Sequence, residues 1–220
     1  MIKKQNYLKH AIVLFLLLLL MQPERAWAAY ENVEFSSLTN HDGLTNSQVG
    51  AILKDTRGYI WFGTQSGLCR FDGFRMKTFY YSNTDDKSLP NNSVDELQQD
   101  YDGNIWVHTS VGYSIYKYDE EQFDRKPEEW LKNIHVQGPP YKLLIDKDKN
   151  MWIAVYGQGL FFHNAKTKNT YLFKFTKKAQ PGCLKEGNIS KITEVDGDAL
   201  ITYNDGTICR VNGQKQKVLW

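Results

Sequence analysis

The sequence predicts an all-β protein, and three observations support that prediction. A motif of seven residues returns along the chain at intervals of 45, 46 and 48 residues. Between its copies lie short runs rich in Ile, Val, Phe, Tyr and Trp, separated by turn-forming residues. Beyond the first thirty or so residues, no stretch shows a convincing helical period. We therefore expect strands joined by tight turns.

Composition sets the limits within which a function can be sought. The chain has 220 residues, of which 41% are hydrophobic and 24% are charged, which suffices for one domain with a core and argues against a polytopic membrane protein. The three cysteines show no CxxC spacing and the five histidines no ligand spacing. The sequence therefore predicts no disulfide framework, no metal site and no cofactor.

Residues 1–28 are predicted to be a signal peptide. A basic head precedes an apolar run over residues 11–21, and Ala26 and Ala28 occupy the two positions that signal peptidase reads. The alternative is an uncleaved membrane anchor, but eleven helical residues span only about 16 Å, roughly half of a bilayer core. Cleavage leaves residues 29–220 close to neutral, which disfavours nucleic acid as a partner.

The repeated motif joins an acidic residue to a tryptophan six positions later. Aspartate accepts hydrogen bonds from backbone amides ahead of it and glycine adopts positive φ freely, so Asp-x-x-Gly predicts a tight turn. The tryptophan falls on the next strand, where its side chain can fill the space between stacked sheets. A weaker copy runs from Glu194 to Leu200. We interpret as structural the six repeat positions Asp55, Trp61, Asp100, Trp106, Asp146 and Trp152.

A period near 45 residues with about four strands per unit is typical of a β-propeller blade. With this period, residues 29–220 are long enough for about four blades of antiparallel strands, which would form an incomplete ring. The expected blades lie at approximately 43–87, 88–134, 135–183 and 184–220. Residues 31–38 form a possible closing strand. Because an incomplete ring leaves sheet faces unpacked, we expect the chain to be marginally stable or to self-associate.

The run from Gly43 to Gly73 and its relatives at 88–118 and 140–163 resemble the regulator-propeller repeats in periplasmic sensor halves of bacterial hybrid two-component histidine kinases. The resemblance implies an N-terminal fragment of such a sensor, located in the periplasm. It implies a non-catalytic ligand-sensing module that binds an oligosaccharide and has downstream sensor domains or a homodimer partner. The kinase part expected of such a sensor is absent from these 220 residues.

Residues that break the repeat are the candidates for ligand contact, because they have less reason to exist for packing alone. His108 stands where the first repeat has Gly63, and an insertion at 120–138 adds further polar and aromatic residues. The alternative is that each such residue serves only the structure. The predicted ligand-binding residues are His108, Trp130, His135 and Tyr156.

Two other functions remain open at this stage. The aspartate turns are similar to those of sialidase propellers, so a secreted propeller glycoside hydrolase or lyase is the enzymatic alternative. It is disfavoured because residues repeated once per blade lie far apart, whereas a catalytic carboxylate pair lies within about 10 Å. A truncated, non-functional sensor fragment is the third possibility. We predict no catalytic residues.

Overall fold

The computed structural model of the chain describes residues 36–176 and 183–219. The chain divides into two compact units, Met1–Ser37 and Leu38–Trp220, and all strands described belong to the second. The predicted signal peptide and most of the possible closing strand lie outside the described residues. Positions 36–38, the described end of that segment, are not in a strand.

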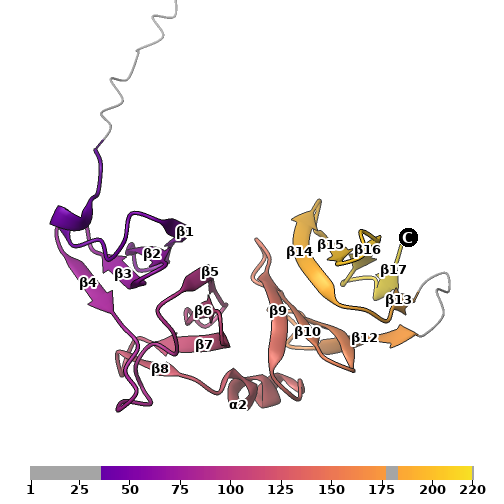
Figure 1. Cartoon of the computed structure of the whole chain (residues 1–220). Coiled ribbons are helices and arrows are strands. Elements are labelled where there is room, and N and C mark those ends of the chain that lie inside the picture. Colours follow the sequence, from indigo (N-terminus) through magenta and orange to yellow (C-terminus); the bar gives the residue numbers. More distant parts are fainter. Residues whose placement is uncertain (1–35, 177–182, 220) are drawn as a thin grey trace, which may run out of the picture. The chain divides into compact units, whose positions relative to one another are not determined.

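The described strands form four sheets in chain order, and in each sheet four consecutive strands form an antiparallel meander (Figure 1). We call these sheets blades 1 to 4. Blade 1 contains β1 (Val49–Lys54), β2 (Ile60–Thr64), β3 (Gly67–Phe71) and β4 (Met76–Phe79). Blade 2 contains β5 (Val94–Gln99), β6 (Ile105–Thr109), β7 (Gly112–Lys117) and β8 (Gln122–Asp124). The predicted all-β architecture of propeller blades is confirmed.

The second half of the chain repeats this arrangement with one addition. Blade 3 contains β9 (Pro140–Ile145), β10 (Met151–Val155), β11 (Gly159–His163) and β12 (Thr170–Thr176). Blade 4 contains β14 (Ile189–Val195), β15 (Asp198–Tyr203), β16 (Ile208–Asn212) and β17 (Lys217–Val218). The short strand β13 (Leu184–Lys185) lies in the range expected for blade 4 but pairs in parallel with β12, as a fifth strand of blade 3.

The insertion between blades 2 and 3 contains helical turns, which the sequence did not predict. They are α2 (Pro127–Leu131) and η2 (Lys132–Ile134); a further 3-10 turn, η1 (Asn40–Asp42), precedes blade 1. Five residues are too few to establish a helical period, and Pro127 fixes a helical φ at the first position. Leu131 and Ile134 are buried in the core between blades 2 and 3, so tertiary packing stabilises this short helix.

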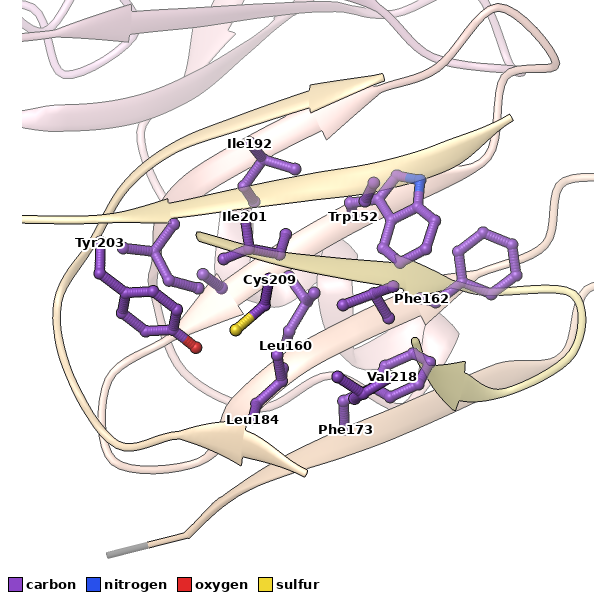
Figure 2. Packing of buried hydrophobic residues seen from close by; sticks show 14 residues of the cluster. Trp152, Leu160, Phe162, Phe173, Leu184, Ile192, Ile201, Tyr203, Cys209 and Val218 are labelled. Carbon is purple, nitrogen blue, oxygen red and sulfur yellow. The ribbon is translucent and has the colours of Figure 1, made fainter. Parts of the chain in front are cut away.

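Three hydrophobic clusters hold the blades together, and each joins two consecutive blades. Trp61 packs with residues of blade 2, Trp106 with residues of blade 3, and Trp152 with residues of blade 4. All three indoles are almost completely buried. Figure 2 shows the third cluster, in which Trp152 of blade 3 lies near Ile192 and Ile201 of blade 4. The tryptophan column thus fills the space between stacked sheets.

The repeated aspartates connect each turn to its tryptophan. One carboxylate oxygen accepts from the backbone amides two and four positions ahead, and the other accepts from the indole Nε1 six positions ahead. The carboxylate-to-indole distances are 2.7 Å for Asp55, 2.9 Å for Asp100 and 3.3 Å for Asp146. One buried carboxylate therefore fixes both the turn and the orientation of the core side chain.

The fourth copy of the motif is built differently, and its predicted alignment on Glu194 is wrong. Glu194 lies within β14, and its carboxylate accepts from the backbone N–H of Lys147 in blade 3 at 2.9 Å. The turn is instead a two-residue hairpin of Asp196 and Gly197, both at positive φ. Asp-Gly is a preferred pair for such a type I′ turn. Glu194 therefore connects two blades rather than capping its own turn.

Candidate functional site

A groove between blades 2 and 3 brings together two of the four predicted ligand-binding residues. Its volume is about 490 Å³, which falls within the range of small-molecule sites. His108 of β6 and Tyr156, which follows β10, both border it. The remaining lining residues are Val111, Gly112, Tyr113, Arg125, Pro127, Glu128, Pro139, Pro140 and Tyr141.

Two stacked tyrosines form the blade 3 side of the groove. The rings of Tyr141 and Tyr156 lie 4.0 Å apart between centroids at an interplanar angle of 17°. Tyr156 is 65% exposed, whereas Tyr141 is half-buried and its hydroxyl accepts from the backbone N–H of Ile189 at 3.4 Å. Burial raises the pKa of Tyr141, so its hydroxyl stays protonated. The inner ring is held in place, and the outer ring presents an aromatic surface to solvent.

A polar network that includes the groove residue Tyr113 connects the two blades. The Tyr113 hydroxyl donates to Glu96 Oε2 at 3.1 Å and accepts from the backbone N–H of Leu143 at 3.0 Å. Lys142 Nζ lies 3.6 Å from Glu96 Oε1. Burial, together with the charge of Glu96, raises the pKa of Tyr113 far above its ordinary range. Tyr113, which borders the groove, therefore joins blade 2 to the first strand of blade 3.

His108 is a neutral imidazole at the edge of this network. Its ring lies 4.5 Å from that of Tyr113, and its Nδ1 is 3.9 Å from Asp95 Oδ2. Within residues 36–176 and 183–219, that buried nitrogen has no hydrogen-bond partner. Burial lowers the pKa of His108; Lys142 lowers it further, while Glu96 and Asp95 oppose the shift. A neutral imidazole can both donate to and accept from a ligand hydroxyl.

We expect the His108 ring to titrate below its ordinary pKa of 6.5. Because the folded pKa is lowered, the unfolded chain binds a proton first as the pH falls. The His108 contribution to stability is therefore complete above pH 6.5 and declines as the pH falls below it, until the folded-state pKa is reached. Two-dimensional NMR of the imidazole signals, assigned with a His108→Gln variant, measures the midpoint. A midpoint at or above 6.5 would contradict this burial-driven shift.

The other two predicted residues do not border the groove. Trp130, on α2, packs edge-on against Trp106 with ring centroids 5.4 Å apart, and its second ring neighbour is Tyr101 at 6.1 Å. His135 is exposed, adopts a left-handed backbone with φ of 62°, and ends η2. The structure thus places Trp130 in a packing role and His135 at a helix terminus.

Sequence reasoning missed Tyr141, although a signal for it exists. Tyr141 occupies the repeat column that holds Gly50 in blade 1 and Asp95 in blade 2, so it breaks the repeat as His108 does. Arg125 was also missed. Its guanidinium donates to the carbonyl oxygens of residues 82, 85, 88 and 89 and so fixes the loop before β5. No periodicity could have indicated that contact.

A second cavity, of about 340 Å³, lies between the first strands of the four blades. Its polar side chains include Glu96, Gln98 and Lys142. Gln98 is engaged, because its amide bonds the backbone of Leu143 and Ile145 at 3.0 and 2.5 Å. Glu96 and Lys142 also interact with each other. This cavity lacks the aromatic surface of the groove, which makes the groove the better candidate site.

The described part of the chain offers little for other chemistry. Among residues 36–176 and 183–219, no three His, Cys, Asp or Glu side chains are grouped so that they could hold a metal ion. The three repeated aspartates each bond their own turn and tryptophan, and Asp55 also accepts from the Tyr118 hydroxyl. No described helix has the length and apolar character needed to cross a membrane.

Four sheets packed face to face, three of them through a buried tryptophan, define an all-β structure of propeller blades with a groove between blades 2 and 3. Residues 43–66 and 88–110 match the family described as two-component regulator propeller. These segments are two-component regulator propeller repeats, and the resemblance seen in the sequence is confirmed.

The chain is similar to parts of several larger proteins. A stretch of 61 residues is 41% identical to part of histidine kinase P4 of Formosa agariphila. The stretch makes up 28% of this chain and 4% of that protein. Among solved structures, the chain is similar to an extracellular domain from B. thetaiotaomicron that is described as part of hybrid two-component system BT3049. The TM-score is 0.57, the sequence identity is 23%, and the match covers 83% of this chain. The extracellular domain of BT4673 matches with a TM-score of 0.50, 18% identity and 78% of this chain. The chain covers 26% and 24% of those two domains, and these structural likenesses show the fold.

Proposed function

We propose that this chain is a periplasmic, non-catalytic ligand-sensing module of a two-component sensor and that its ligand is an oligosaccharide. The regulator propeller repeats at residues 43–66 and 88–110 support the sensor assignment. The structural neighbours, which are extracellular domains of two-component systems, support exposure outside the cytoplasm. Its partners are then the ligand and either downstream sensor domains or a homodimer partner.

The observation that carries the proposal is the exposed tyrosine pair at the groove. The C–H faces of pyranose rings pack on aromatic faces as other apolar surfaces do, and Tyr156 presents such a face to solvent. The neutral His108 ring and the Glu128 carboxylate, which also border the groove, provide hydrogen-bond groups for sugar hydroxyls. A volume of about 490 Å³ suits one or two sugar units.

Sensing requires that the ligand favour one arrangement of the protein over another. The position of the groove supports this proposal because its walls come from different blades: His108 and Tyr113 belong to blade 2, while Tyr141 belongs to blade 3 and Tyr156 follows β10 of that blade. A sugar that contacts both walls strengthens the arrangement in which Tyr113 bonds Glu96 and the Leu143 amide. The signal would then be a change in how firmly blades 2 and 3 are joined.

The experiment is a panel of defined oligosaccharides tested against the purified exported chain. We expect saturable binding, measured by calorimetry and by a rise in melting temperature, with at least one member of the panel. We also expect no increase in reducing ends during prolonged incubation. New reducing ends would establish the glycosidase or lyase alternative instead, and a lack of binding across a panel of neutral and acidic glycans would reject the oligosaccharide.

Tyr156→Ala is expected to weaken binding of the oligosaccharide identified in that panel at least tenfold, about 1.4 kcal/mol. The variant removes the exposed stacking face, and because Tyr156 is 65% exposed its loss changes stability little. Calorimetric titration of wild type and variant gives the ratio of affinities. The matched control is Tyr80→Ala, because Tyr80 is 51% exposed, follows β4 of blade 1 and does not border the groove. Equal affinity of Tyr156→Ala and wild type would exclude this surface.

A further inference from the structure

A second exposed aromatic ring lies beside the groove, on the loop between blades 1 and 2. Tyr81 follows β4 and is 46% exposed. The guanidinium carbon of Arg125, a residue that borders the groove, lies 5.5 Å from the centroid of the Tyr81 ring. Tyr81 itself is not among the residues that line the groove. Arg125 therefore connects the groove to an aromatic surface outside it.

Both the ring and the guanidinium are held in place. The backbone N–H of Tyr81 donates to Asn92 Oδ1 at 2.7 Å, and Tyr81 forms a β-bridge with Leu89. The Nε and Nη2 groups of Arg125 donate to four carbonyl oxygens of the same loop at 2.9 to 3.3 Å. These bonds order the loop before any ligand arrives, so binding there costs less conformational entropy.

One end of this guanidinium is unused. Within residues 36–176 and 183–219, Nε and Nη2 make every hydrogen bond of Arg125, and Nη1 makes none. Nη1 is also not among the buried atoms of those residues that lack a partner, so it is accessible. Arg125 forms no ion pair with any described residue, and the neighbouring Asp124 lies 3.6 Å from Lys117 Nζ instead. The structure thus leaves a fixed cation with free N–H donors.

An accessible guanidinium N–H favours an anionic group on the ligand. The Nη1 hydrogens can donate to an oxygen of a carboxylate or a sulfate, and such charge-assisted bonds are about twice as strong as neutral ones. Glu128 also borders the groove and repels an anion. The attraction therefore has to come from a direct bond to Arg125 rather than from the net charge of the groove.

We propose that the ligand is an acidic oligosaccharide that extends beyond the groove, with a carboxylate or sulfate bound by Arg125 and a further sugar stacked on Tyr81. The groove suits one or two sugar units, so a ligand that also reaches Tyr81 contains about three or more. This inference rests on the proposed oligosaccharide-sensing function and adds the charge and the length of the ligand.

Matched ligands test the charge. The purified exported chain is titrated with tetrasaccharides that carry carboxylates or sulfates and with their carboxyl-reduced or desulfated counterparts. We expect one acidic series to bind at least about tenfold more tightly than its neutral counterpart, and salt to reduce this preference. The series that binds identifies the anionic group. Equal affinity of acidic and neutral forms would overturn the acidic ligand but leave oligosaccharide sensing intact, whereas no binding by any form would reject both.

Tyr81→Ala tests the subsite outside the groove. The variant is expected to weaken binding of the acidic tetrasaccharide about fivefold, because it removes a stacking face. Binding of the corresponding disaccharide, which fits within the groove, is expected to change little. Tyr80→Ala is the matched control, since Tyr80 is the adjacent aromatic residue and is 51% exposed. Equal loss for both ligands, or none for the tetrasaccharide, would overturn a second subsite at Tyr81.

Two charge variants test the role of Arg125. The preference is the ratio of the affinities for the acidic and the neutral tetrasaccharide. Arg125→Gln is expected to reduce this ratio to about 1, and thermal melting verifies that the variant folds. Glu128→Gln removes a repelling charge and is expected to raise the ratio about twofold, with no loop contact at stake. A folded Arg125→Gln that keeps the wild-type preference, or a lower preference in Glu128→Gln, would contradict the proposed contact.

Discussion

Asp100→Ala is expected to lower the free energy of unfolding by about 2–4 kcal/mol. The substitution removes the acceptor for the backbone amides of Asp102 and Asn104 and for the buried Trp106 Nε1–H. A buried donor left without a partner costs about 1–3 kcal/mol, and the capping bonds of the turn are lost as well. A local change at one turn thereby loosens the core between blades 2 and 3.

Urea unfolding followed by tryptophan fluorescence measures this loss. The matched control is Asp102→Ala, which removes an exposed carboxylate from the same turn while its backbone amide still bonds Asp100. We expect the control to stay within about 0.5 kcal/mol of wild type. An equally small effect of Asp100→Ala would show that the aspartate column does not hold the tryptophans.

Trp106→Ala is expected to destabilise the protein by about 3–5 kcal/mol. The indole is 1% exposed and lies in the cluster that joins blades 2 and 3. Removing it leaves a large cavity between sheets whose packing is the main connection between these blades. The substitution also removes the edge-on ring contact that Trp106 makes with Trp130 on α2. We expect the midpoint of thermal unfolding to fall by more than 10 °C.

Trp106→Leu provides the comparison for this effect, because the fourth blade has Leu200 at the same position. Leucine fills part of the space and is expected to recover about half of the stability lost in the alanine variant. Chemical unfolding of wild type, Trp106→Ala and Trp106→Leu under one set of conditions ranks their free energies of unfolding. If Trp106→Ala and Trp106→Leu unfolded like wild type, the tryptophan column would not form the inter-blade core.

The repeated part of the fold could be predicted from the sequence because its interactions are local. Asp55, the turn that follows it and Trp61 lie within seven residues, so a periodic motif contains the bonds that join the turn to the tryptophan. The further bond that Asp55 accepts from the Tyr118 hydroxyl of blade 2 lies outside the motif. Hairpin turns fix the antiparallel pairing of neighbouring strands. The period then predicts how many such units the chain contains, and the structure shows four sheets in chain order.

Features that depend on contacts between blades were beyond sequence reasoning. Glu194 fits the motif by spacing, yet its carboxylate bonds Lys147 in another blade. Helix α2 is stabilised by core residues contributed by blades 2 and 3. His108 and Tyr156 break the repeat and border the groove. Trp130 lies in the insertion and instead packs against Trp106 as a partly buried side chain, a difference that only the packing of two blades reveals.

Hydrogen exchange with and without the bound oligosaccharide tests the central claim most directly. The account predicts slower amide exchange in peptides that cover residues 108–113 of blade 2 and 139–156 of blade 3, because a ligand in the groove contacts both. Tyr156→Ala is expected to lose this protection at the same ligand concentration. Protection confined to other blades, or to one wall alone, would contradict a ligand-sensing groove between blades 2 and 3.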